Sequence, residues 1–157
     1  MGKAFYELGL QYGGVTRVFS MYGKADSADE NKYFPQLMFT GFSDNKVRFV
    51  LRSIETGRRS DIVVMSHINL LVVGYLIKFF KPSVKLALLA HGIEVWNPLP
   101  GWKKHMLNKC DLILPVSHFT RDKMISQHGI PEERFSVFNN CLEPFLERSL
   151  SEDKNAA

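Results

Sequence analysis

Four short apolar runs, each followed directly by polar residues, constrain the fold of this sequence more than any other feature. Amphipathic stretches long enough for helices separate them. Near-continuous apolar strands that alternate with helices are typical of a parallel sheet covered on both faces. The sequence therefore predicts a three-layer α/β/α fold with a mostly parallel sheet. The predicted strands are residues 61–66, 84–90, 112–116 and 135–138, and the predicted helices between them are residues 70–80, 102–109 and 119–128.

The first half of the chain has weaker patterns. A first strand is expected at residues 3–8, and Gly13–Gly14 follow it. Paired glycines let backbone N–H groups approach a phosphate when a helix begins behind them. The other expectations for the chain ends and the first half are a helix at residues 15–22, a loop or frayed helix end at 24–32, a strand at 33–42, a helix at 45–56 and a disordered tail at 151–157.

The length and composition indicate an ordinary soluble domain. The 157 residues suit one domain with its own core, which we expect to span residues 1–150. The most apolar stretch, residues 62–77, is too short for a transmembrane helix and is interrupted by polar residues. Cys110 and Cys141 lack the spacing of metal ligands. We therefore expect a reduced, cytoplasmic setting.

The net charge of +4 is unevenly distributed, because residues 75–109 carry six lysines and a single acidic residue. Two interpretations stay open: a solvated lysine-rich face, or contact with anionic lipid or a phosphorylated ligand. Nucleic acid is not an expected partner, because no binding motif is present. If the contact is with a membrane, the residues expected to face it are Lys78, Lys81, Lys103 and Lys104, with Phe79, Phe80 and Trp102 beside them.

Polar residues follow each of the four predicted strands. They are Ser66 and His67, then residues 91–94 with His91 and Glu94, then Ser117, and finally Asn140. The carboxyl ends of parallel strands lie along one edge, where ligands bind in such folds. Structural roles stay open for several of them. His67 could cap backbone groups, Ser117 could cap a helix, Asn140 could belong to a turn, and Trp96 could serve packing.

Four stretches of the sequence resemble glycosyltransferase family 4. They are residues 13–18 (GGVTRV), 91–96 (HGIEVW), 110–120 (CDLILPVSHFT) and 135–140 (FSVFNN), in that order. The resemblance covers roughly residues 10–145 and is to the N-terminal domain of the GT-B enzymes in that family. It implies a Rossmann-like fold that forms one half of a GT-B enzyme.

The resemblance also implies a function: retaining transfer of a sugar from a nucleotide-sugar donor to a glycan or a lipid-linked acceptor, without a metal. It assigns His91 a catalytic place beside the transferred sugar, and it places Gly13, Gly14 and Arg17 near the donor diphosphate. The cleft-lining residues that it implies on the acceptor side are Ser66, His67, Glu94, Trp96, Ser117 and Asn140.

The sequence departs from the family pattern in ways that affect function. The donor-binding domain and its pair of glutamates have no counterpart, and Cys141 stands where the family often has glycine. We therefore expect an excised domain or a natural half-protein that is inactive alone, cytoplasmic or peripheral at the inner face of the membrane. The alternative is a non-catalytic half-enzyme or regulatory module that pairs with a separate donor-domain chain. An unrelated nucleotide-binding protein is disfavoured, because no G-x-G-x-x-G or Walker pattern is present.

Overall fold

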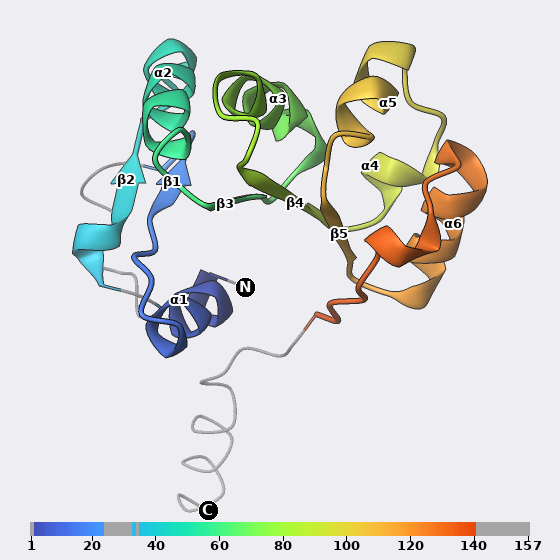
Figure 1. The fold of residues 1–157 in the computed structure, drawn as a ribbon, viewed down its shortest axis with the longest axis horizontal. Helices are drawn as coiled ribbons and strands as arrows, with labels where there is room; N and C mark the ends of the chain where they lie inside the picture. The colour runs from blue at the N-terminus through green and yellow to red at the C-terminus, as the bar shows by residue number, and fades with distance from the viewer. Residues whose placement is uncertain (1, 24–32, 34, 141–157) are drawn as a thin grey trace, which may run out of the picture.

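The structure, a computed structural model, describes residues 2–23, 33 and 35–140. Figure 1 shows the arrangement of its helices and strands. The helices are α1 (Gly2–Gln11), α2 (Lys46–Gly57), α3 (Leu71–Phe80), α4 (Ile93–Trp96), α5 (Gly101–Leu107) and α6 (His118–His128). The strands are β1 (Val18–Ser20), β2 (Phe39–Gly41), β3 (Ile62–Met65), β4 (Lys85–Ala90) and β5 (Leu112–Pro115).

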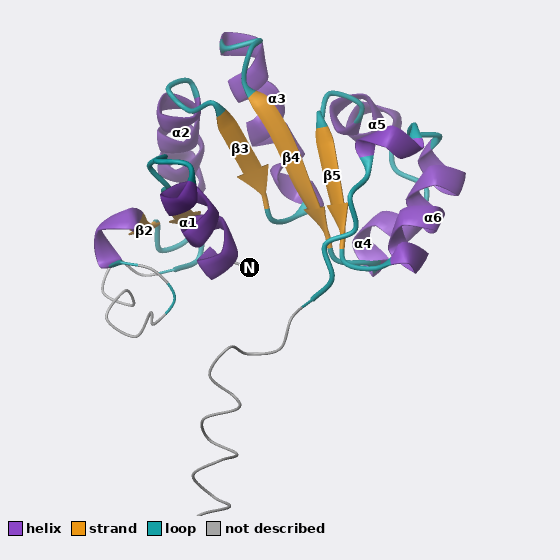
Figure 2. Cartoon of the chain, turned by 60° about the horizontal axis from the view of Figure 1, so that its bottom comes forward, coloured by secondary structure: helices purple, strands orange, loops and turns teal. Residues whose placement is uncertain are grey.

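The described strands form two parallel sheets, and helices lie on both sides of them (Figures 1 and 2). One sheet has the order β3-β4-β5, with Met65 opposite Leu88 and Ala90 opposite Pro115. The other contains β1 and β2. The predicted Rossmann-like α/β class is confirmed, and so are the three central strands. The sheet itself differs from the prediction, because it is divided in two.

Alternate residues of β4 build the two cores. Leu86, Leu88 and Ala90 face the larger core, to which α3, α4, α5 and α6 contribute buried side chains. Ala87 and Leu89 face the opposite side, where Phe5 of α1 packs against them. All five side chains are buried. This period of two is what a strand covered on both faces requires.

The fourth predicted strand, residues 135–138, is wrong as a regular strand, although the segment does run along β5. One bridge joins Phe135 to Ile113, and the N–H groups of Ser136 and Phe138 donate to the carbonyls of Ile113 and Pro115. The next ladder bond would need an N–H from Pro115, which proline lacks. The pairing is therefore incomplete.

The predicted strand at residues 3–8 is also wrong, because these residues belong to α1. The segment contains no β-branched residue and is rich in helix formers, and Lys3 lies 3.6 Å from Glu7 one helical turn away. The predicted helix at residues 15–22 is wrong as well, since β1 lies there. Val15, Thr16 and Val18 are β-branched, which favours a strand.

The remaining elements agree with the sequence pattern. Asn45 caps α2 by accepting a hydrogen bond from the N–H of Arg48, and α6 ends at Gly129 in the left-handed conformation (φ 65°). Helices α3 and α5 also occupy the expected segments. Among the described residues of the expected strand at 33–42, only Phe39–Gly41 is a strand. The expectations for residues 24–32 and 151–157 lie outside the described residues.

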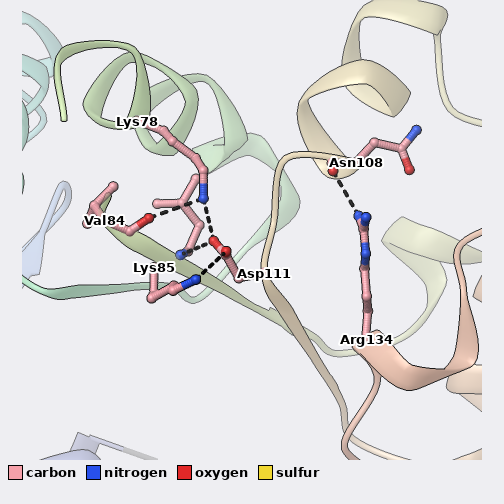
Figure 3. Close-up of polar contacts among 7 residues, drawn as sticks. Lys78, Val84, Lys85, Asn108, Asp111 and Arg134 are labelled. Atoms are coloured by element: carbon pink, nitrogen blue, oxygen red, sulfur yellow. Dashed lines mark hydrogen bonds and ion pairs between the residues drawn. The ribbon is translucent and has the colours of Figure 1, made fainter. Parts of the chain in front are cut away.

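A network of ion pairs joins the amino ends of β4 and β5 (Figure 3). The carboxylate of Asp111 accepts hydrogen bonds from the Nζ atoms of Lys78 and Lys85 and from the N–H of Leu86. Lys78 also donates to the carbonyl of Val84 at 3.1 Å. Partial burial raises the pKa of Asp111, but the hydrogen bonds from Leu86 and Lys78 and the charge of Lys78 outweigh it, so the pKa falls below 3.8.

We expect Asp111→Asn to lower the free energy of unfolding by about 1–3 kcal/mol at pH 7, because the carboxylate accepts charge-assisted hydrogen bonds. The folded-state pKa of Asp111 is depressed. Its stabilising contribution is therefore present above about pH 4 and lost as the pH falls through the folded-state pKa. Urea denaturation at a series of pH values from 7 to 2 measures this difference. The free energies of unfolding of the unmodified protein and of Asp111→Asn should become equal in acid. Asp122→Asn, at an exposed carboxylate, is the control. A difference that does not change with pH would contradict this role.

Candidate functional site

The carboxyl ends of β3, β4 and β5 bring three of the predicted residues to one edge. Ser66 follows β3, His91 follows β4, and Ser117 lies two residues beyond β5. The Nε2 atom of His91 lies 3.1 Å from the carbonyl oxygen of Ser66. The N–H of Val116 donates to the carbonyl of Ala90 at 3.0 Å, which holds the other two strand ends together. The prediction that these residues share an edge is confirmed.

His91 is exposed, and its ring orientation is fixed by the hydrogen bond to Ser66. A carbonyl oxygen only accepts hydrogen bonds, so Nε2 must carry the proton in this contact. In a neutral imidazole this leaves Nδ1 as an acceptor. The edge therefore presents an oriented histidine with an acceptor nitrogen available to a hydroxyl group.

The turn after His91 is held by Glu94 and requires Gly92. Oε1 of Glu94 accepts a hydrogen bond from the N–H of His91 at 2.7 Å. Gly92 has φ 149°, a conformation that L side chains rarely adopt, and a Cβ atom there would lie 3.2 Å from the ring of Trp96. Glu94 thus acts here by holding the backbone of His91 rather than by exposing both carboxylate oxygens.

Trp96 and Ser117 make structural contacts with the beginning of α6. The half-buried indole of Trp96 packs edge-on against Phe119, and its Nε1 lies 3.4 Å from Oγ1 of Thr120. Oγ of Ser117 caps α6 by accepting from the N–H of Thr120 at 3.1 Å. The buried Thr120 hydroxyl links both residues, and nothing in the sequence pattern singled it out.

His67 and Asn140 lie near the same edge with different contacts. Nδ1 of His67 accepts from the N–H of Asn69 at 3.0 Å and so caps the 3-10 helix Ile68–Leu70. Asn140 is exposed and is the last described residue, two positions after Phe138, whose N–H donates to Pro115 at the end of β5. His67 thus caps backbone groups, the structural role left open by the sequence.

Gly13, Gly14 and Arg17 are not in the predicted context. Gly13 has φ 66°, and the N–H of Gly14 donates to the carbonyl of Gly9 at 2.7 Å, so the glycine pair ends α1. Arg17 directly precedes β1 and therefore lies at its amino end. The expected order of strand, glycine pair and helix is wrong, because a helix precedes the pair and a strand follows it. The helix N-terminus that would favour a phosphate is not behind these glycines.

Lys103, predicted as part of a membrane face, has a polar contact within the protein. Its Nζ donates to Oδ1 of Asn69 at 2.7 Å, which brings a cation from α5 to the segment that follows β3. Its only sequence signal was membership of the lysine-rich segment, which was interpreted as a possible membrane face. The contact with Asn69 depends on tertiary packing.

The other lysines of the predicted membrane face are mostly engaged. Lys78 bonds to Asp111, and Lys81 donates to the carbonyl of Ser60 at 2.8 Å, so the expectation that both face outward is wrong. The aromatic residues agree with the expectation, because Phe79 is 70% exposed and Phe80 and Trp102 are also exposed. Among the described helices, none is long and apolar enough to cross a bilayer.

A cavity of about 400 Å³ lies at the opposite, amino edge of the sheet, lined by residues that include Lys85, Lys109 and Arg134 around Asp111. Its lining holds ion pairs that join strand ends, and it contains no histidine. Within residues 2–23, 33 and 35–140, no cluster of three or more potential metal ligands is present.

Comparisons with known proteins give a family and a similar fold. The family model described as Glycosyltransferase Family 4 matches residues 17–144. Among solved structures, HepE of Anabaena, determined in complex with UDP and glucose, matches with a TM-score of 0.64 and 16% sequence identity. The match covers 99% of this chain and 47% of HepE, so the chain spans about half of that protein. The comparison with curated proteins gives no match.

We expect Ser117→Ala to lower the free energy of unfolding by about 1 kcal/mol, because it removes the cap of α6. Asn45→Ala removes the corresponding cap of α2, far from the tryptophans, and serves as the matched control. Both variants should lose stability in urea denaturation. Only Ser117→Ala should also change tryptophan fluorescence, since Thr120 connects the cap to Trp96. An unchanged stability in Ser117→Ala would contradict the capping role.

Proposed function

Because the chain belongs to glycosyltransferase family 4, we propose that it is the acceptor-side half of a retaining glycosyltransferase. In this proposal it transfers a sugar from a nucleotide-sugar donor to a glycan or lipid-linked acceptor. The observation that carries the proposal is the oriented imidazole of His91 at the carboxyl end of β4. The structure of HepE with UDP and glucose is consistent with a nucleotide-sugar donor.

In the proposed reaction, the bond between the sugar's anomeric carbon and the donor diphosphate breaks, a bond from that carbon to the acceptor oxygen forms, and the proton of the acceptor hydroxyl passes to the leaving diphosphate. Nδ1 of His91 accepts a hydrogen bond from a hydroxyl group of the bound sugar and so fixes the sugar's position. Ser66 and Glu94 hold the histidine from its two sides.

The donor nucleotide is bound, in this proposal, by a region that this chain does not contain. We propose that the reaction uses no metal or other cofactor and that it takes place on the cytoplasmic side of the membrane. Neutralisation of the leaving diphosphate then falls to N–H groups and basic side chains. The chain alone is therefore expected to be inactive.

The test is a sugar-transfer assay of residues 1–157 alone and joined to the donor-binding half of a family 4 enzyme. We expect transfer only in the joined protein. There, His91→Ala should lower kcat at least about 100-fold, which corresponds to about 2.7 kcal/mol of transition-state stabilisation. It should cost less than about 1 kcal/mol of folding stability, because the side chain is exposed.

His105→Ala is the matched control, because this exposed histidine lies on α5 and contacts the ring of Tyr75. It should retain the activity of the unmodified joined protein. Full activity of His91→Ala, or a large loss of stability without a loss of kcat, would contradict the proposed role of His91. Sugar transfer by the chain alone would contradict the proposal that another region binds the donor nucleotide.

A lipid-linked acceptor would bring the outer surface of α3 and α5 to the membrane. The rings of Tyr75 and His105 join these helices at 5.7 Å, and Phe79 and Trp102 lie exposed on the same two helices. Exposed aromatic rings with nearby lysines suit the interfacial zone of an anionic bilayer. We propose this surface as the membrane contact, with Lys104 and Lys109 in place of the engaged Lys78 and Lys81.

Co-sedimentation with vesicles rich in phosphatidylglycerol measures this contact. We expect binding at low salt that weakens as salt rises, because screening acts over about 10 Å at 0.1 M. Phe79→Ser with Phe80→Ser should abolish binding, and Lys104→Gln with Lys109→Gln should reduce it several-fold. Leu10→Ser, an exposed apolar position on α1, should bind normally. Failure to bind at low salt would rule out the membrane contact and favour a soluble glycan acceptor.

A further inference from the structure

The cavity at the amino edge of the β3-β4-β5 sheet concentrates positive charge. Of the side chains that line this cavity of about 400 Å³, the charged ones are four cations and one carboxylate: Lys78, Lys85, Lys109, Arg134 and Asp111. The three lysines come from the lysine-rich segment of the sequence, and the arginine comes from the 3-10 helix Glu132–Arg134. Together the five side chains carry a net charge of +3. Tertiary packing thus adds a distant arginine to a cluster of lysines.

Asp111 neutralises only part of this charge. Its Oδ2 accepts a hydrogen bond from Lys78, and its Oδ1 accepts one from Lys85 at 3.3 Å. Lys78 is half-buried and also donates to a backbone carbonyl, so its amino group is held by the fold. The side chain of Lys85 is 69% exposed. An ammonium group has three N–H donors, so Lys85 keeps donors for a further acceptor.

Arg134 and Lys109 have no acidic partner among the described residues. One N–H of Arg134 donates to the carbonyl of Asn108 at 2.9 Å (Figure 3). A guanidinium group carries five N–H donors, and this contact uses one of them. The exposed side chain of Lys109 makes no hydrogen bond or ion pair with any residue that the structure describes. Two positive groups of the cavity are therefore available to an anion.

The helix ends at this edge account for some of the positive charge, but not for all of it. Helices α3 and α5 each end a few residues before β4 and β5 begin, so their C-termini lie at the amino edge. A helix C-terminus is equivalent to about −0.5 of an elementary charge. Lys78 in the last turn of α3 and Arg134 on the carbonyl of Asn108 suit these two ends. Together the two ends offset about one charge, which leaves an excess of about +2.

A phosphate monoester has the chemistry that this excess requires. Its phosphate group carries a charge of about −1.5 to −2 at pH 7, whereas a carboxylate carries at most about −1. The planar fork of an arginine matches the oxygen atoms of a phosphate, and lysines bind phosphate as point charges. Since like charges gathered in one cavity repel each other, an anion of this charge also relieves the repulsion among the cations.

A second, mostly apolar cavity adjoins the first. Its volume is about 230 Å³, and its walls include Tyr75, Phe79 and Pro82. Lys78 and Lys109 line both cavities, so the two meet at these lysines. A ligand whose phosphate group lies in the first cavity can place an apolar or aromatic group in the second. The pair of cavities therefore favours an organic phosphate over the inorganic ion.

We propose that the amino-edge cavity binds a phosphate monoester. Lys109 and Arg134 contact the phosphate group, Lys85 adds positive charge, and the organic part of the ligand lies against Tyr75 and Phe79. The site is separate from the candidate site, because His91 lies at the opposite edge of the sheet. This inference goes beyond the proposed function and does not rest on sugar transfer. The same chemistry is found in a soluble phosphate monoester and in phosphatidic acid, a lipid with a monoester headgroup.

The first test is an NMR titration of ¹⁵N-labelled residues 1–157 with phenyl phosphate. We expect saturable shifts of the amides of Lys109, Cys110 and Phe135, which lie in or beside the cavity. Inorganic phosphate should bind at the same amides but more weakly, because it lacks a ring to bury. Lys109→Gln and Arg134→Gln should each raise the Kd for phenyl phosphate at least about fivefold, since each removes a charge-assisted hydrogen bond.

Lys123→Gln is the matched control, because it removes the same charge from an exposed position on α6 outside the cavity. Its Kd should change less than about twofold, since screening weakens distant charges. A dispersed amide spectrum in each variant shows that it folds. Equal weakening by Lys123→Gln and Lys109→Gln would overturn the proposal, because it would indicate attraction to the net charge alone.

Co-sedimentation with vesicles distinguishes the two sources of the phosphate group. Phosphatidylcholine vesicles contain either phosphatidic acid or phosphatidylglycerol, matched for total charge. Stronger binding to phosphatidic acid that Arg134→Gln abolishes would support the site with a lipid headgroup as its ligand. Saturable binding of phenyl phosphate without a preference for phosphatidic acid would support it with a soluble ligand. Absence of both effects would overturn the proposal.

Discussion

Burial of β4 between two parallel neighbours is the constraint on which the rest of this structure depends. Leu86, Leu88 and Leu89 are almost fully buried on its two faces, and each such side chain contributes about 1.5–3 kcal/mol when removed from water. Because β3 and β5 are held in register with β4, Met65 at the end of β3 lies beside Leu88, and Pro115 at the end of β5 lies beside Ala90. This register places Ser66 close enough to the end of β4 for Nε2 of His91 to reach its carbonyl oxygen.

The candidate site lies where the chain leaves the buried sheet at the end of β4. Ala90 is fully buried and His91, the next residue, is exposed. The chain can leave the sheet so sharply because Gly92 adopts φ 149° and Glu94 binds the N–H of His91. Packing of Trp96 against the core then fixes the short helix that carries Glu94. A core contact thus helps to position the candidate site residue His91, and the exposed imidazole itself contributes little to packing.

The parts of the fold that the sequence predicts are those whose signal is local. Three apolar strands, the capped helices α2 and α6, and the polar residues at strand ends all follow from periodicity and capping. The predictions that were wrong concern segments where helix and strand tendencies compete, or contacts with residues far away in the sequence. Residues 3–8 were apolar enough for a strand, but helix formers and an ion pair favour α1. Pro115 limits the pairing of residues 135–138. The engagement of Lys78 with Asp111 depends on a residue 33 positions away.

The two ends of the larger sheet differ in how their polar groups are used. At the amino edge, the Asp111 carboxylate accepts three hydrogen bonds, and Lys78 bridges it to a backbone carbonyl. This cluster joins the strand ends to one another. At the carboxyl edge, the protein uses Nε2 of His91 to orient the ring and leaves Nδ1 without a role in the fold. Because Nδ1 of His91 is positioned by the fold and has no hydrogen bond among the described residues, the proposed function assigns its remaining hydrogen bond to a substrate hydroxyl group.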